Sequence, residues 1–262
     1  MSVETQQQIV KKKMIVKKLP YELVISEEPL LIIQTKEPSK KKIQTEDLGK
    51  QFEMAICLLC GIPFVGKYNY SMEKAEKIKD RLYLFAAEFP HKLKHTAEKG
   101  GQYDFTGIED SSIKLSAKTT KKDNKVCPQV IGQPTKKSFC AFFGIDFSYS
   151  LEQIKSYIVE NVVSMLDIYF GFTFDCPVLF YNEKNDTVQL IKLVKKINWS
   201  EKSIEFSHIK NHKDWNESSC ISVDGVTIGE FQIHNHRNSI KFRWAFVKLL
   251  TKFPESFEIV NL

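Results

Sequence analysis

The amino-acid sequence predicts an α+β fold in which helices flank a mixed central β-sheet. Apolar residues recur at helical spacing after Thr45, and Ser150 opens a second helix with Gln153 as its capping-box partner. Beyond residue 171 the pattern changes to short strands, and Asp224-Gly225 between two of them is typical of a β-hairpin. This order of helices, strands, a helix and more strands indicates the mixed α/β or α+β class.

Helices and strands can be placed in order along the chain. Thr45, Glu46 and Asp47 begin a helix that ends at Gly61, and a second helix is expected over residues 71–89. The other expected elements are strands at 103–107, 113–119 and 139–147, a helix from Ser150 to Leu166, strands at 178–181, 188–194, 220–223 and 226–233, and a helix over 243–253.

Size and composition exclude several classes of protein. The chain has 262 residues, of which 42% are hydrophobic, so it can bury a sizeable core. It has no window of about 18 uncharged apolar residues that could span a membrane. Residues 1–10 are polar and lack the apolar stretch of a signal peptide, and six scattered cysteines are too few for a disulfide scaffold. We therefore expect a cytoplasmic protein without a membrane partner.

Positive charge is concentrated in one segment. Residues 111–142 contain seven Lys and one Asp, a balance that equals the formal net charge of +6 for the whole chain. Such a segment indicates a polyanionic partner, and a solvated lysine-rich loop is the alternative. Residues 1–44 also hold basic clusters, around apolar runs at 21–25 and 30–33, which predicts an N-terminal basic arm or hairpin.

Two expected strands bring acidic and basic side chains together. Strands 103–107 and 113–119, joined by a short polar turn, place Asp104 beside Ser116-Ala117-Lys118. Because side chains alternate along a strand, Ser116 and Lys118 share one face. A carboxylate can hold a divalent cation there, and an ammonium group can steer a nucleophilic water or offset phosphate charge.

This arrangement resembles the PD-(D/E)XK nuclease superfamily and, within it, the type II restriction endonucleases. In that family an Asp and an acid-X-Lys motif lie on neighbouring strands and hold Mg²⁺. Asp104 and Lys118 match the Asp and the Lys, whereas Ser116 stands in place of the acid and Tyr103 in place of the family's Pro. The resemblance covers about residues 45–170 and implies a nuclease core there.

The family also has a helical Glu that often reaches the metal site, and Glu53 in the first helix is similar to it. Glu53 is therefore the preferred compensating acid for Ser116, with Glu109 and Asp110 as alternatives. The resemblance implies that Asp104, Ser116, Lys118 and Glu53 are catalytic. It also implies that Asp104, the Ala117 backbone carbonyl and Glu53 bind Mg²⁺.

Residues suited to DNA binding follow the predicted catalytic strands. Lysines of the basic segment can hold the phosphate backbone, whereas Gln, Asn, His and Arg in residues 229–243 can read base edges. In that C-terminal stretch Glu230, Gln232 and His234 are expected on one strand face, with Phe231 and Ile233 packing on the other. The predicted DNA-binding residues are Lys121, Lys122, Lys125, Gln129, Gln133, Lys136, Lys137, Gln232, His234, Asn235, His236, Arg237, Lys241 and Arg243.

Other motifs offer weaker alternatives. Asp224 followed by Glu230-Phe231-Gln232 is a second possible nuclease motif, although its Asp is expected at a hairpin tip. Cys57 and Cys60 have a zinc-like spacing inside an apolar helix, where core cysteines are the better interpretation. His208 and His212 have helical spacing and are expected on a surface loop near DNA.

Together these patterns predict a Mg²⁺-dependent, sequence-specific double-stranded DNA endonuclease that leaves 5′-phosphate ends. Its expected parts are an arm over 1–44, a nuclease core over 45–170 and a strand-rich DNA-recognition region over 171–262. A palindromic target would suit a homodimer, and a monomer that cuts the two strands in turn is the alternative. The competing hypotheses are a repair or junction-resolving nuclease and a nuclease-fold DNA-binding protein that has lost catalysis.

Overall fold

A computed structural model describes residues 15–18, 23–26, 45–97, 101–121, 125–128, 133–234, 236 and 238–262. The chain forms two compact units, Met1–Lys42 and Ile43–Leu262. Within the described part, no helix is both long enough and apolar enough to cross a membrane.

The first unit contains a two-stranded antiparallel sheet. Its strands are β1 (Ile15–Lys18) and β2 (Leu23–Ser26). A hairpin was predicted in this region from the apolar runs at 21–25 and 30–33. The first run overlaps β2, the second lies outside the described residues, and β1 is the observed partner strand.

The second unit contains a six-stranded mixed sheet with the order β13-β8-β7-β5-β4-β3. β5 and β7 are parallel, and the other neighbours are antiparallel. The strands are β3 (Leu93–His95), β4 (Phe105–Gly107), β5 (Lys114–Thr120), β7 (Val178–Asn182), β8 (Thr187–Leu193) and β13 (Phe257–Asn261).

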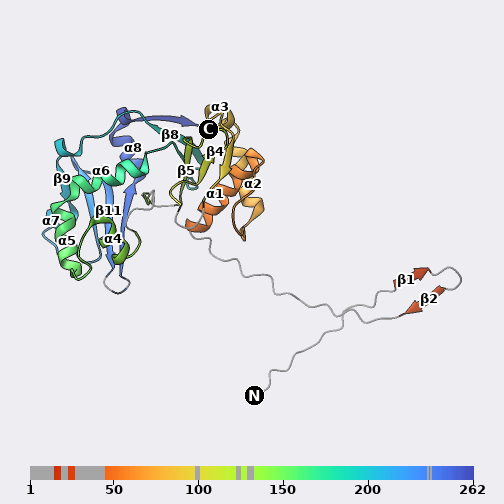
Figure 1. Ribbon diagram of the computed structural model, residues 1–262, viewed down its shortest axis with the longest axis horizontal. Helices are drawn as coiled ribbons and strands as arrows, with labels where there is room; N and C mark the ends of the chain where they lie inside the picture. Colours follow the sequence, from red (N-terminus) through yellow and green to blue (C-terminus); the bar gives the residue numbers. More distant parts are fainter. Residues whose placement is uncertain are drawn as a thin grey trace, which may run out of the picture. The chain divides into compact units, whose positions relative to one another are not determined.

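One face of this sheet is covered by the N-terminal helices of the unit. Leu48 and Phe52 of α1 (Thr45–Cys60) pack with Leu115, Leu179 and other apolar side chains of the sheet. α2 (Met72–Lys79) and α3 (Phe85–Glu88) extend the same core, and Figure 1 shows α1 and α2 beside β4 and β5.

A five-stranded antiparallel sheet forms the rest of the unit, with the order β6-β12-β11-β10-β9. Its strands are β6 (Lys125–Val126), β9 (Ile204–Phe206), β10 (Ser218–Val223), β11 (Val226–His234) and β12 (Ser239–Ala245). The accompanying helices are α4 (Lys136–Phe143), α5 (Leu151–Glu160), α6 (Val162–Thr173), α7 (Ser207–Lys210) and α8 (Phe246–Lys252). In Figure 1 they gather around this sheet.

The two sheets share one hydrophobic core. Phe180 of β7 belongs to the same buried cluster as Phe242 of β12 and Tyr169 of α6. The Tyr169 and Phe242 rings stack at 4.5 Å, and the indole of Trp244 donates a hydrogen bond to Thr173 Oγ1 at 2.9 Å. Both sheets also join strands from before and after residue 170, so the predicted boundary there does not separate the sheets.

Local signals placed several elements correctly. The first helix spans Thr45–Cys60, as predicted. The capping box between Ser150 and Gln153 is present at the start of α5, and both of its hydrogen bonds are formed. The hairpin at Asp224-Gly225 is also confirmed, since both residues have the positive φ angles that a tight turn between these strands needs.

Four element predictions were wrong in part. The predicted helix from Ser150 to Leu166 is two helices, because α5 ends at Glu160 and α6 begins at Val162 and continues to Thr173. The predicted strand at 139–147 is helix α4 over its first half, because Thr135 caps Ser138 N–H and Gly144 ends the helix in a left-handed conformation. The predicted helix at 243–253 begins only at Phe246, because the alternating burial of β12 continues to Ala245. The predicted helix at 71–89 is broken into α2, a 3₁₀ turn and α3.

Close packing in the five-stranded sheet gives a first test. A Cβ added at Gly229 of β11 would lie 2.7 Å from Cζ of the fully buried Phe242 ring. We expect Gly229→Ala to destabilise the protein by about 1–3 kcal/mol, because the ring or the strand must move. Urea unfolding at constant pH measures this loss.

A matched control is Gly171→Ala in α6, where the added Cβ would meet nothing within 4 Å apart from its chain neighbours and the backbone of its own helix. There the change should be neutral or stabilising by up to about 1 kcal/mol, because alanine favours a helix. Equal unfolding midpoints for Gly229→Ala and the unmodified chain would contradict the packing described for β11 and β12.

Candidate active site

Asp104 lies directly beside the β5 strand. β4 and β5 pair antiparallel with Phe105 opposite Leu115, so the preceding Asp104 meets Ser116. Asp104 Oδ2 accepts hydrogen bonds from the Ala117 N–H at 2.7 Å and from Ser116 Oγ at 3.2 Å. Lys118 Nζ lies 3.8 Å from the same oxygen. The predicted juxtaposition of these residues is confirmed, whereas their catalytic role stays a prediction.

The alternation of side chains along β5 determines which face of the sheet carries Ser116 and Lys118. Ser116 and Lys118 are the register partners of Val178 and Phe180 on β7, which belong to the core shared by the two sheets. Leu115 instead belongs to the core beneath α1. Ser116 and Lys118 therefore share the sheet face that points away from α1, as the period of a strand requires.

Glu53 lies on the other side of the sheet. Its carboxylate contacts Lys50 Nζ at 2.7 Å and His95 Nε2 at 3.0 Å. The Val65 N–H donates to His95 Nδ1 at 2.9 Å, so Nε2 carries the ring proton and donates it to Glu53. Glu53 and His95 are both buried, and the ring packs on Phe105 of the α1-side core.

The structure thus does not bring Glu53 to Asp104 and Lys118. Glu53 lies on a helix, as predicted, but the sequence could not show which face of the sheet that helix covers. The two alternative acids lie in the turn between β4 and β5. There Glu109 pairs with Lys92 at 2.7 Å, and Asp110 accepts the Ser112 N–H at 2.8 Å.

Sequence reasoning missed Asp175, an acid at the border of the cluster. Its carboxylate accepts hydrogen bonds from the Tyr103 hydroxyl and from Gln102 Nε2, both at 2.7 Å. Asp175 lies just before β7, and the carbonyl of Pro177, also before β7, accepts the Ser116 N–H at 3.0 Å. Burial raises the pKa of the neighbouring Cys176 thiol to about 12, with Asp175 and Asp104 adding to the rise and Lys118 opposing it. The available signal was an acid just before the strand predicted at 178–181.

The donor atoms at Asp104 suit a hard divalent cation only in part. Oδ2 accepts the β5 hydrogen bonds, so Oδ1 is the carboxylate oxygen that could bind a cation. Among the described residues, no group of three His, Cys, Asp or Glu side chains could hold a metal ion by itself. Mg²⁺ commonly binds one or two carboxylates and completes its shell with water and substrate phosphate oxygens, and a site of that kind fits Asp104.

Residues of the basic segment adopt different environments. Lys125 Nζ contacts Glu230 Oε2 at 2.7 Å, and Lys136 lies 4.8 Å above the exposed Phe147 ring. Gln133 Oε1 accepts the Phe242 N–H at 2.9 Å, so it supports β12. Lys137 is exposed on α4, and Lys121 is half-buried after β5. Lys122 and Gln129 lie outside the described residues.

Residues 229–243 lie in β11, β12 and the turn between them. The polar side chains on one face of these two strands form a polar strip, which consists of Glu230, Gln232, His234, Ser239, Lys241 and Arg243. Phe231 and Ile233 are buried, whereas Glu230, Gln232 and His234 share the opposite face, as predicted. Their cross-strand partners are Arg243, Lys241 and Ser239. Glu217 lies 3.3 Å from His234 Nδ1 and 3.6 Å from His236 Nδ1. Asn235 and Arg237 lie outside the described residues.

The second possible nuclease motif is not assembled. Asp224 lies in the exposed hairpin turn and pairs with Lys252 at 3.0 Å. Glu230, six residues further along the sequence, contacts Lys125 and Arg243 instead.

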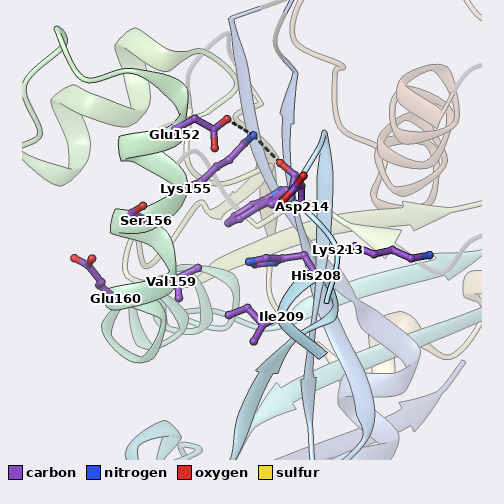
Figure 2. A pocket seen from close by; sticks show the side chains of 10 residues that line it. Glu152, Lys155, Ser156, Val159, Glu160, His208, Ile209, Lys213 and Asp214 are labelled. Atoms are coloured by element: carbon purple, nitrogen blue, oxygen red, sulfur yellow. Dashed lines mark hydrogen bonds and ion pairs between the residues drawn. The ribbon is translucent and has the colours of Figure 1, made fainter. Parts of the chain in front are cut away.

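His208 belongs to a separate pocket of about 350 Å³ between α5 and residues 208–215, which Figure 2 shows. Neither Asp104 nor Lys118 lines it. Buried Lys155 bonds there to Glu152 and to the Trp215 carbonyl, both at 2.7 Å. Burial, followed by the charge of Lys155, lowers the pKa of His208, whose Nδ1 lies 2.7 Å from Ser219 Oγ. The lowered pKa favours the neutral imidazole.

Comparison with known proteins gives one informative similarity. The type II restriction enzyme CviAII of Paramecium bursaria Chlorella virus 1 is 44% identical over 232 residues, which cover 88% of this chain and 67% of that protein. No protein-family model matches the chain, and no solved structure does.

The buried Glu53–His95 pair gives a second test. We expect Glu53→Gln to destabilise the protein by about 1–3 kcal/mol, because the charge-assisted bonds to His95 and Lys50 weaken inside the core. Thermal and urea unfolding measure this effect, and the exposed Glu76→Gln on α2 is the matched control. If both variants unfolded at the midpoint of the unmodified chain, the Glu53 contacts would contribute nothing to stability.

Proposed function

This chain belongs to the type II restriction enzymes, and from that premise we propose that it hydrolyses DNA phosphodiesters with Mg²⁺ held at Asp104. Family membership establishes the reaction class, which is site-specific cleavage of DNA by an endonuclease. The placement of the chemistry is our proposal, and one observation carries it. Asp104, Ser116, the Ala117 N–H and Lys118 converge on adjacent strands within hydrogen-bonding or ion-pairing distance.

Asp104 has two tasks in this proposal. Its Oδ2 is fixed by the Ala117 N–H and Ser116 Oγ, which sets the direction of the carboxylate. Its Oδ1 would then hold the cation, with the Ala117 carbonyl and a helper carboxylate nearby. We assign the helper role to Asp175 in preference to Glu53, because the Glu53 carboxylate is bonded to His95 and Lys50 on the α1 side of the sheet.

A divalent cation at this position supplies positive charge to the phosphoryl group and lowers the pKa of a water molecule. Lys118 has the remaining task. Its ammonium group lies near Asp104 on a half-buried strand face, where it can orient the attacking water and offset charge that develops on the phosphate. In-line attack would leave a 5′-phosphate and a 3′-hydroxyl, as the family resemblance implies.

DNA binding would divide between two groups of residues. Lys121, Lys136 and Lys137 would hold the phosphate backbone, which makes binding dependent on salt concentration. The polar strip of β11 and β12 would face base edges through Gln232, His234, Lys241 and Arg243, whose side chains can donate to or accept from the major groove. Lys122, Gln129, Asn235, His236 and Arg237 complete the proposed DNA-binding set.

The role of Lys118 can be tested by substitution. We expect Lys118→Ala to lower the rate of single-turnover cleavage at least 100-fold, because the ammonium group near Asp104 is lost, while DNA affinity changes little. Plasmid digestion and a gel-shift assay in Ca²⁺ measure the two effects. Lys94→Ala, at an exposed position on β3, is the control and should cut like the unmodified enzyme. Cleavage by Lys118→Ala at the unmodified rate would remove Lys118 from the mechanism.

Metal removal tests the second part of the proposal. We expect EDTA to abolish cleavage and excess Mg²⁺ to restore it, because the Lys118 ammonium group alone cannot both activate a water molecule and offset the charge of the phosphoryl group. Asp104→Asn should remain inactive after Mg²⁺ is added back. Discrete plasmid fragments formed in EDTA, or full activity of Asp104→Asn, would show that the cation is not held at Asp104.

A further inference from the structure

Glu230 is a buried carboxylate that holds two cations from other strands. Its Oε2 lies 2.7 Å from Lys125 Nζ on β6 and 3.0 Å from Arg243 Nη2 on β12. The Glu230 side chain is 8% exposed, whereas those of Lys125 and Arg243 are 29% and 25% exposed. The acid therefore lies beneath two cations that reach the surface of the polar strip.

The electrostatics of this triad favour a fixed arrangement. Burial by itself raises the pKa of Glu230, but the hydrogen bonds and charges of Lys125 and Arg243 outweigh it and leave the pKa below its usual value. Glu230 is thus ionised at pH 7. A buried carboxylate between two cations restrains their side-chain torsions, and a planar guanidinium held in this way keeps its orientation before it meets a ligand.

The same triad adjoins the proposed catalytic strand. Lys118 lies on β5, which ends at Thr120, and β6 begins five residues later at Lys125. β5 belongs to the six-stranded sheet, whereas β6 pairs with β12, with Lys125 opposite Ala245 and Val126 opposite Trp244. Lys125 is therefore paired with the strand that carries Arg243. It lies only seven residues after Lys118 in the sequence.

We propose that Glu230 is a positioning residue for site specificity, which presents the Arg243 guanidinium to a guanine edge of the DNA target. Through its ion pair with Lys125, Glu230 also connects the Arg243–guanine contact with the chain segment that follows β5, the strand that carries Lys118. This inference rests on the proposed function, because it takes cleavage at β5 as given. Arg243 suits the role because its fork can donate to guanine O6 and N7 together, which a lysine cannot do.

A bidentate contact to guanine is worth about 1–3 kcal/mol of discrimination against another base, or roughly 5- to 150-fold. Loss of its orientation should therefore lower specificity more than it lowers affinity for arbitrary DNA. In contrast, a purely electrostatic contact with phosphate would weaken binding equally on all sequences.

The test compares cleavage at the cognate site with cleavage at sites that differ by one base pair. The cognate site is first read from sequenced ends of plasmid fragments. We expect Glu230→Gln to lower the ratio of cognate to near-cognate cleavage at least 10-fold, with additional plasmid fragments, while binding to unrelated duplex DNA in Ca²⁺ changes less than 3-fold. The control is Glu205→Gln on β9 of the same sheet, which removes an exposed ion pair with Lys210 of α7. This variant should keep the original cleavage ratio.

Arg243→Lys is a second test that does not depend on the folding of Glu230→Gln. It keeps the positive charge beside Glu230 but removes the planar guanidinium. It should show the same loss of discrimination. An unchanged ratio in both variants, an equal loss of cleavage and binding on every sequence, or complete loss of cleavage by folded Glu230→Gln would overturn the inference. If the unmodified enzyme produced no discrete fragments with Mg²⁺, the proposed function would fail instead.

Discussion

The hydrogen bond from the Ala117 N–H to the Asp104 carboxylate is the contact on which the proposed active site depends. A backbone donor in the middle of a strand has no rotamer freedom, so the register of β4 against β5 sets the place of the carboxylate. A slip of one residue would turn Lys118 toward the α1 side of the sheet. The parallel pairing with β7 holds β5 from its other edge, through the Ser116 N–H and the Pro177 carbonyl.

The rest of the unit keeps that register in place. Apolar side chains from α1 fill one side of the six-stranded sheet, and the core shared with the five-stranded sheet fills the other. Cleavage chemistry and base recognition would thus be supported by one packed interior, with β5 and β6 joining the two sheets along the chain. No described helix or loop separates them as an independent recognition module.

What the sequence predicted was determined by short-range signals. Asp104 and Lys118 are fourteen residues apart and joined by a tight turn, so alternation and turn residues were enough to bring them together. The α5 capping box and the Asp224-Gly225 hairpin are local in the same sense. The aromatic run at 139–147 misled because a short apolar run fits either a strand or a helix, and the choice depended on caps at Thr135 and Gly144.

Contacts between distant residues were not predictable in this way. The Tyr103–Asp175 and Lys125–Glu230 contacts join residues 72 and 105 positions apart, and only the folded sheet order makes them neighbours. Glu53 lies on the helix where it was predicted, but the side of the sheet that a helix covers is a tertiary property. The family resemblance was therefore informative about the reaction and less so about each acid in it.

The common interior beneath both sheets also bears on how such an enzyme diversifies. Enzymes with a separate reading domain can acquire a new target by exchanging that domain as a cassette. Here Phe180, beside the strand proposed to be catalytic, and Phe242, behind the strip proposed to read DNA, belong to the same buried cluster, so a transplanted strip would arrive without its complementary packing. New target sequences are therefore expected to arise by gradual substitution on the outward face of β11 and β12.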